Sequence, residues 1–259
     1  MSPHSALGIA QIIFYVPVVP LALWLMRRNG GIHPRMAWWP LIPFSLIRLA
    51  GGPLVIMLHR DPTNIALATV AMIFLNIGVM PLLVAASGFL RIVIIDNPKI
   101  IDHSLLMQKY LRLSNIIAIA LLSAGGGLGS QPENPLRSIG RALSFAGYGI
   151  FTVELVSIVA AATHLTRYYR VLLSSSRNAL VALFLASPFL LVRTIYAFIQ
   201  VANQHNVFSR WNPLYGSAAL FAVMALLMEY VCLVTFVSTG FSIAPSRGVP
   251  PTLEIECEA

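Results

Sequence analysis

The chain has 259 residues, of which 58% are hydrophobic and 10% are charged, and its net charge is +8. Soluble domains contain about 25% charged residues, so this composition excludes an ordinary soluble protein and indicates a polytopic membrane protein. The positive charge does not require a polyanion, because membrane proteins concentrate lysine and arginine in cytoplasmic loops. We therefore expect no nucleic-acid partner.

A helix needs about 20 apolar residues to cross the hydrocarbon core of a bilayer. The apolar windows of that length lie at residues 6–26, 37–58, 66–90, 110–128, 143–164, 178–201 and 216–240. The sequence thus predicts an all-α fold, a seven-transmembrane-helix bundle over residues 1–242, followed by a disordered cytosolic tail over residues 243–259. The fourth window runs into Gly125, Gly126, Gly127 and Gly129, which should end or loosen its helix.

Lysine and arginine in the loops predict the orientation of the bundle. One side collects Arg27, Arg28, Arg35, Arg91, Lys99, Lys109, Arg112, Arg167, Arg170, Arg177 and Arg247. The other side has only Arg60, Arg137, Arg141 and Arg210. This bias of eleven to four places the amino end in the lumen or outside and the carboxyl end in the cytosol. The first residues lack a basic segment and a small-residue cleavage motif, so the first window is predicted to be a retained span.

Polar side chains interrupt the apolar windows, and a charge at that depth costs about 2.5–3.5 kcal/mol. The second span contains Arg48 and the third contains Asn76. In the fifth span, Ser144, Glu154 and Ser157 follow one helical face, with Tyr148 one position off that line. This face is expected to point inward.

The last two spans carry the remaining buried charges. Arg193 and Tyr196 share a face of the sixth span, and Glu229 lies on a stripe of small residues in the seventh. That stripe, which lets helices approach closely, consists of Ala218, Ala222, Ala225 and Cys232. Two arginines and two glutamates sum to zero, which is consistent with neutralisation inside the bundle.

Two interpretations of these charges remain open. In the first, Arg48 and Arg193 neutralise Glu154 and Glu229 in two structural ion pairs. In the second, one glutamate lines a dry cavity as a neutral acid and donates a proton to a substrate. Glu229 is the favoured acid because its own stripe has no nearby basic residue, with Glu154 as the other candidate. The side chains expected to bind the substrate are Arg48, Arg193, Asn76, Tyr148 and Tyr196.

Several membrane chemistries do not fit these residues. Lys99 and Lys109 lie outside the middle of the membrane, so a retinal Schiff base in the last span is excluded. The six histidines are scattered without ligand spacing, and we expect no metal and no cofactor. Asp96 and Asp102 lack the repeated-acid spacing that holds a magnesium diphosphate. The reaction type that remains compatible with the sequence is one that begins with protonation of an alkene or an epoxide by a carboxylic acid.

The segments IAQIIFYVPVVPLALWL, FSLIRLAGG, IGVMPLLVAASGFL, ASPFLLVRTIYAFI and LLMEYVCLVTFVSTGF resemble a family of small seven-helix integral membrane proteins of filamentous fungi with no assigned function. The resemblance implies that Arg48, Arg193 and Glu229 lie in recognisable family segments. In size, span number and membrane carboxylates, the chain is also similar to fungal membrane-bound cyclases of meroterpenoid and indole-diterpene pathways. Those cyclases protonate an epoxide or alkene without a metal.

The favoured hypothesis is an endoplasmic-reticulum enzyme of fungal secondary metabolism. It would open or cyclise a lipophilic isoprenoid or polyketide with Glu229 or Glu154 as the acid. The alternative is a sensor or receptor-like protein whose basic loops contact partners or membrane lipid. A small-molecule transporter is the third reading, although the chain lacks the internal repeat that many transporters show.

Overall fold

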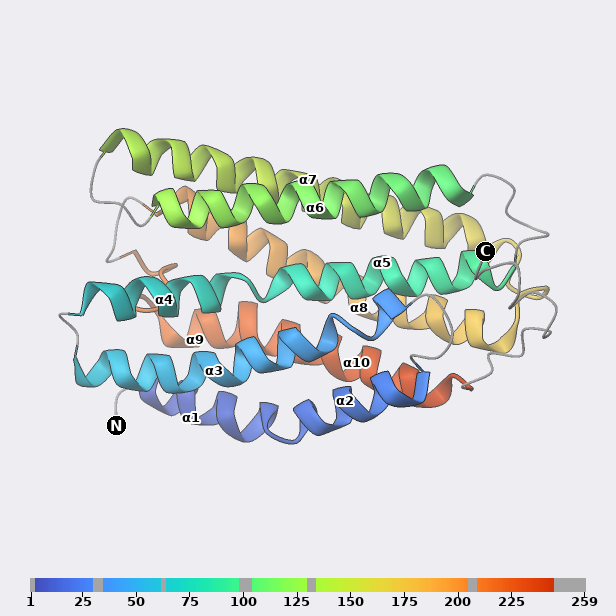
Figure 1. The fold of residues 1–259 in the computed structure, drawn as a ribbon, viewed down its shortest axis with the longest axis horizontal. Helices are drawn as coiled ribbons and strands as arrows, with labels where there is room; N and C mark the ends of the chain where they lie inside the picture. The colour runs from blue at the N-terminus through green and yellow to red at the C-terminus, as the bar shows by residue number, and fades with distance from the viewer. Residues whose placement is uncertain are drawn as a thin grey trace.

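The computed structural model describes residues 3–29, 35–61, 64–97, 104–129, 134–204 and 209–244, apart from the side chains of residues 65, 76, 104–108 and 134. This part of the chain forms an elongated bundle of helices that run back and forth along one axis (Figure 1). Its first elements are α1 (Pro3–Tyr15), α2 (Val18–Asn29), η1 (Arg35–Ala37), α3 (Leu41–Arg60), α4 (Ile65–Asn76) and α5 (Val79–Ile95). They are followed by α6 (Ser104–Gly129), α7 (Asn134–Thr166), α8 (Ser174–Ala202), α9 (Ala218–Phe221), η2 (Ala222–Leu227) and α10 (Met228–Ser242).

These elements combine into membrane spans. Within the described residues, seven helical segments are long and apolar enough to cross a bilayer. They are Pro3–Asn29, Arg35–Arg60, Ala66–Ile95, Lys109–Gly129, Pro135–Thr166, Ser174–Ala202 and Ala218–Ser242. The all-α fold and the seven predicted spans are therefore confirmed. The orientation of the termini stays a prediction, and residues 245–259 of the predicted tail lie outside the described part.

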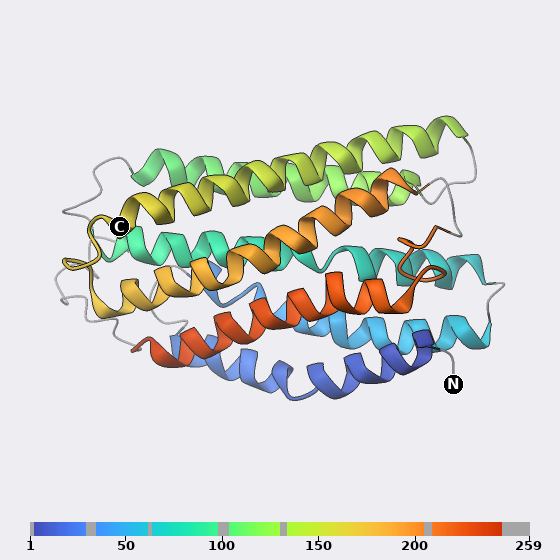
Figure 2. The same ribbon diagram turned by 180° about the vertical axis from the view of Figure 1, so that it is seen from behind.

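The spans form layers around α5. The paired helices α6 and α7 lie along one side, α1 and α2 lie along the other, and α5 runs between them in both views (Figures 1 and 2). Most side chains of α5 are buried, and α8 packs against both α5 and α10. The core thus consists of α8, which carries Arg193, α10, which carries Glu229, and the third span, which is divided into α4 and α5.

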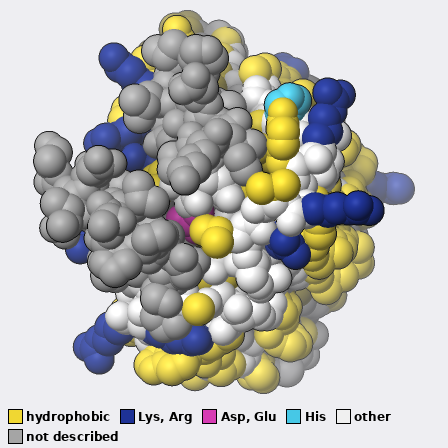
Figure 3. Space-filling model, turned by 90° about the vertical axis from the view of Figure 1, so that its right-hand side faces the viewer, with side chains coloured by type: hydrophobic (Ala, Val, Ile, Leu, Met, Phe, Trp, Pro, Cys, Tyr) yellow, Lys and Arg dark blue, Asp and Glu magenta, His cyan; other side chains and the backbone are white. Residues whose placement is uncertain are grey.

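Basic side chains gather at one end of the bundle. Figure 3 looks onto this end, where Lys and Arg side chains stand around the rim of the face. The described helix ends there carry Arg27, Arg28, Arg35, Arg91, Lys109, Arg112, Arg167, Arg170 and Arg177. The alternating spans therefore place most of the loop lysines and arginines at one end of the bundle, which is the unequal distribution counted from the sequence.

The bundle has apolar outer faces and polar groups inside. On α7, Val153 and Val156 are 67% and 60% exposed, whereas Glu154 between them is buried. Ser144 and Tyr148 are buried as expected, but Ser157 is exposed, so its predicted inward position is wrong. Its hydroxyl donates to the carbonyl of Val153 at 2.7 Å, and this local bond lets a serine face lipid at little cost.

The fourth span does not stop at the start of its glycine cluster. α6 continues through Gly125, Gly126 and Gly127 and ends at Gly129. A Cβ on Gly125 would lie 2.8 Å from the carbonyl oxygen of Gly140 on α7. The missing side chain lets the two backbones touch, so packing against α7 holds a segment of weak helix propensity in the helix.

A second close contact joins α1 to α3. A Cβ on Gly52 would lie 2.6 Å from the carbonyl oxygen of Gly8, and a Cβ on Gly8 would lie 2.8 Å from the carbonyl oxygen of Gly52. Only a pair of glycines allows this crossing, which places α1 against the helix that carries Arg48.

Gly52→Ala should therefore separate α1 from α3 and lower the stability of the bundle by about 1–3 kcal/mol, the usual cost of overpacking. Gly126→Ala is the matched control, because a Cβ there meets nothing within 4 Å and alanine favours the helix. Thermal melting of the purified variants in detergent measures both. Equal melting temperatures for the two variants would show that the Gly8–Gly52 crossing is not close.

Candidate functional site

Three buried charged side chains from three spans meet in the middle of the bundle. Glu229 of α10 contacts both Arg48 of α3 and Arg193 of α8. Nη2 of Arg48 donates to Oε1 of Glu229 at 2.6 Å, and Nε of Arg193 donates to the same oxygen at 2.5 Å. The three residues are 0%, 1% and 0% exposed for Arg48, Arg193 and Glu229 respectively. We call them the central cluster.

The central cluster holds two cations and one anion. Each guanidinium carries a permanent positive charge, and the carboxylate of Glu229 accepts hydrogen bonds from both of them. The cluster therefore has a net charge of +1 inside the membrane. Such a charge is costly unless another acceptor compensates it.

Many donors of the cluster have no acceptor. Nε and Nη1 of Arg48 and both terminal nitrogens of Arg193 are buried and without a hydrogen-bond partner. The second oxygen of Glu229 lies 2.5 Å from Nη2 of Arg48 but outside hydrogen-bond geometry, and it also lacks a bonded partner. Buried polar atoms without a partner are rare in native proteins, and the oxygens of an anion are acceptors that would satisfy these donors.

The third span breaks beside Arg48. Pro81 has no N–H to donate to the carbonyl of Ile77, and that carbonyl accepts from Met80 at 3.1 Å instead. Nη2 of Arg48 donates to the carbonyl of Leu75 at 3.1 Å, which satisfies one backbone group at the break. Gly78 completes the contact, because any Cβ there would collide with the guanidinium of Arg48.

The first and seventh spans are also irregular near the cluster. α1 ends at Tyr15 and α2 begins at Val18, on either side of Pro17. In the seventh span, η2 is a π-helical segment from Ala222 to Leu227 that ends two residues before Glu229. Irregular backbone at membrane depth occurs where protein or a cavity can satisfy it, and π segments are common at functional sites.

Tyrosines surround the charges. The ring of Tyr196 lies 5.8 Å from the guanidinium carbon of Arg193, and its hydroxyl donates to the carbonyl of Trp211 at 3.2 Å. Tyr15 and Tyr148 are buried and close enough to interact electrostatically with Arg48 and Glu229. The hydroxyl of Tyr15 has no partner. Aromatic walls around a cationic centre fit a ligand with an apolar body and an anionic group.

Glu154 lies at a separate site between α6 and α7. Its Oε1 accepts a hydrogen bond from Nδ2 of Asn115 at 2.5 Å, while its Oε2 and the side-chain oxygen of Asn115 have no partner. Neither Arg48 nor Arg193 reaches it, since their ion pairs are with Glu229. The prediction of two separate ion pairs is therefore wrong.

The structure brings together Arg48, Arg193, Tyr148, Tyr196 and Glu229 among the predicted site residues. Glu154 is separate, and the side chain of Asn76 lies outside the described part. The stripe of Glu229 has no basic residue of its own, but Arg48 and Arg193 reach the glutamate from two other helices. Sequence reasoning missed Asn115, whose signal was an amide inside an apolar window.

Metal chemistry receives no support from the described residues. No group of three His, Cys, Asp or Glu side chains in that part of the chain is arranged to hold an ion. The donors of the central cluster are mostly guanidinium groups, which repel cations. The site is therefore suited to an anion.

Residues 1–246 match the family described as Domain of unknown function (DUF7702). The match covers most of the chain, which therefore belongs to this family. No curated protein and no solved structure matches the chain.

Unequal effects on stability are expected from single neutralising substitutions in the cluster. Glu229→Gln leaves two buried guanidiniums without a counter-charge and should cost about 3–5 kcal/mol. Arg193→Gln leaves a neutral Arg48–Glu229 pair and should cost less than half as much. Thermal melting and the yield of folded protein measure the difference.

The double variant Arg193→Gln/Glu229→Gln is the control. It should be more stable than Glu229→Gln alone, because it removes one of the two uncompensated cations. If Arg193→Gln were as damaging as Glu229→Gln, the charges would not be coupled through a single glutamate.

Proposed function

We propose that this member of the family binds a small organic anion with an apolar body at the central cluster and carries it through the membrane. The observation that supports the proposal is the imbalance of the cluster, in which one glutamate faces two arginines. A carboxylate or sulfonate group on a ligand would neutralise the extra charge. It would also accept hydrogen bonds from the unpaired guanidinium nitrogens, which favour planar oxyanions.

Burial explains why the ligand would be selected by charge. A neutral molecule leaves the cluster at +1 in a low-dielectric interior, whereas an anion brings it to zero. The phenol and ring faces of Tyr15, Tyr148 and Tyr196 would contact the rest of the ligand. The expected class is therefore a lipophilic or aromatic acid, in agreement with the lipophilic small-molecule partner expected from the sequence.

The broken helices favour transport over a receptor function. Discontinuous spans that meet at a charged site near the middle of the membrane are typical of transporters, where the breaks allow the two halves of a span to move separately. Here, the breaks at Tyr15–Val18 and Asn76–Val79 border Arg48 and its neighbours. Movement at these joints would expose the cluster to one side and then to the other.

Binding is tested with 4-toluenesulfonate, an aryl anion that remains ionised and does not cross lipid by itself. It should raise the melting temperature of the purified protein and enter proteoliposomes faster than protein-free vesicles. Arg193→Gln should weaken binding at least tenfold, because loss of a charged hydrogen-bonded contact costs about 1.5–3 kcal/mol. Arg141→Gln, at one end of the bundle, is the matched control.

Two outcomes would overturn this proposal. One is equal stabilisation by the uncharged 4-toluenesulfonamide, which would show that charge is not recognised. The other is unchanged binding by a folded Arg193→Gln protein. Melting without ligand verifies that each variant is folded before binding is compared.

A second candidate function is acid-initiated chemistry at Glu154, and the isolation of that carboxyl favours it. Neither arginine of the central cluster contacts Glu154, so its carboxyl is not engaged in an ion pair as that of Glu229 is. Its unpaired oxygen and that of Asn115 leave two polar atoms for a substrate. In this candidate function, the protein would act as the similar fungal cyclases and epoxide-opening enzymes do. It would serve secondary metabolism and lie in the membrane of the endoplasmic reticulum.

Glu154→Gln separates chemistry from structure. Glutamine retains the acceptor for Asn115, so the protein should accumulate and melt nearly as the wild type does. As a proton donor, Glu154 would contribute about 10²–10⁴-fold to the rate, and turnover should fall accordingly. The measurement is metabolite profiling of the source organism after gene deletion and restoration with wild type or Glu154→Gln at matched protein level. Full restoration by the variant would exclude Glu154 as the acid.

A further inference from the structure

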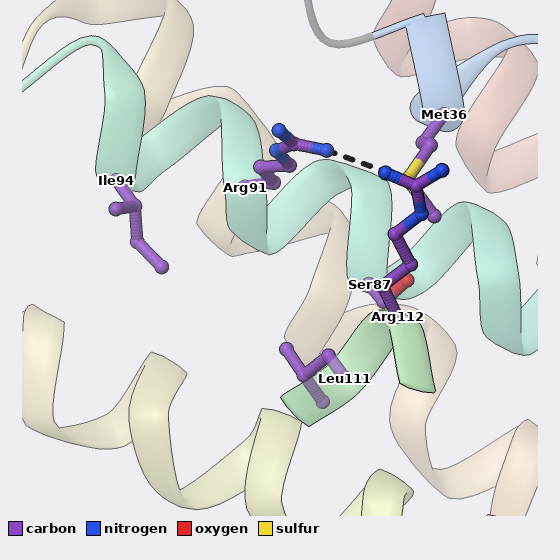
Figure 4. A pocket seen from close by; sticks show the side chains of 6 residues that line it. All are labelled: Met36, Ser87, Arg91, Ile94, Leu111 and Arg112. Atoms are coloured by element: carbon purple, nitrogen blue, oxygen red, sulfur yellow. Dashed lines mark hydrogen bonds between the residues drawn. The ribbon is translucent and has the colours of Figure 1, made fainter. Parts of the chain in front are cut away.

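A hollow near one end of the bundle lies apart from the central cluster. It is lined by Met36, Ser87, Arg91, Ile94, Leu111 and Arg112, which come from η1, α5 and α6. Figure 4 shows the side chains of Arg91 and Arg112 extending toward Met36 from two different helices. No acidic side chain is among these lining residues, so the hollow is cationic.

The two arginines have few acceptors in this hollow. Nη1 of Arg91 donates to the sulfur of Met36 at 3.6 Å, and its Nε is buried without a partner. A thioether is a weak acceptor for a guanidinium. Arg112 is exposed and close enough for its charge to act on Arg91. Two adjacent cations with unused donors form a site for a group with several negatively charged oxygens.

The depth of the hollow matches the level of lipid headgroups. Arg91 lies four residues before the end of the third span at Ile95, which is about 6 Å at 1.5 Å per residue. Arg112 of α6 lines the same hollow as Arg91 and therefore lies at a similar level. Phosphate groups of a bilayer lie in this polar zone, outside the hydrocarbon core.

An apolar stripe continues from the hollow toward the middle of the membrane. On α6, Ile116 and Ile119 follow Arg112 at intervals of four and three residues and are 57% and 39% exposed. Residues with this spacing share one helical face. A molecule whose phosphate lies between the arginines would find a hydrocarbon-compatible surface directly beneath it. A lipid fits both parts, whereas free phosphate uses only the first.

We propose that the hollow is a binding site for an anionic phospholipid whose headgroup ends in a phosphate monoester. Arg91 and Arg112 donate to the phosphate oxygens, and an acyl chain lies along the face of Ile116 and Ile119. A phosphate monoester carries a charge of about −1.5 to −2 near neutral pH, which matches two guanidiniums, whereas a phosphodiester carries only one charge. Basic pockets between spans are known to hold lipid headgroups of this kind.

The test uses the full chain in phosphatidylcholine nanodiscs with and without phosphatidic acid. Phosphatidic acid should raise the melting temperature and remain bound in native mass spectrometry. Arg91→Gln and Arg112→Gln should each weaken this binding about tenfold, corresponding to the loss of one charged hydrogen-bonded contact. Arg141→Gln, at the opposite end of the bundle, should bind as the wild type does.

Glycerol 3-phosphate supplies the headgroup without acyl chains and distinguishes a lipid from a soluble phosphate compound. It should bind much more weakly than phosphatidic acid. Equal binding of the two would overturn the assignment to lipid, and equal binding of phosphatidylcholine and phosphatidic acid would overturn the phosphate site. Melting of the variants in pure phosphatidylcholine shows whether they are folded. The central cluster is not involved, so these results are independent of the proposed transport function.

Discussion

A carboxylate shared by two guanidiniums inside a membrane constrains the whole bundle. Each ion loses its hydration there, and only short contacts in a fixed geometry offset that loss. Glu229 must therefore be reached by Arg48 and Arg193 at the same oxygen, which fixes the positions of α3, α8 and α10 relative to one another. The break between Asn76 and Val79 belongs to the same constraint, because the carbonyl of Leu75 accepts from Arg48 and Gly78 leaves room for the guanidinium.

Hydropathy predicted the spans well because the length of an apolar window depends only on neighbours along the chain. The pairing of charges depends on which helix faces which, and no spacing within one helix contains that information. Counting four charges that sum to zero suggested two pairs, yet the structure places both arginines on Glu229 and gives Glu154 an amide partner. The exposed Ser157 shows a related limit, since its hydroxyl is satisfied within its own helix.

Arg91 and Arg112 each have two roles, of which only one can be predicted from the sequence. Both count as loop charges that indicate orientation, and both also line a hollow between helices. The second property depends on the third and fourth spans lying side by side at one end of the bundle. In contrast, the central arginines were conspicuous from their position in apolar windows alone. A binding site formed by charges near span ends is therefore harder to predict from the sequence than one formed by charges at mid-span.

The order of synthesis gives the central cluster a consequence for biogenesis. Arg48 is made 181 residues before Glu229, the side chain that neutralises it. At about 5–20 residues per second, the second span would wait roughly 10–40 s for its counter-charge. During that interval, Arg48 needs shelter in the insertion machinery or at the lipid–water boundary. A chain that ended before the seventh span would retain two uncompensated arginines, a feature by which quality control could recognise an unfinished protein.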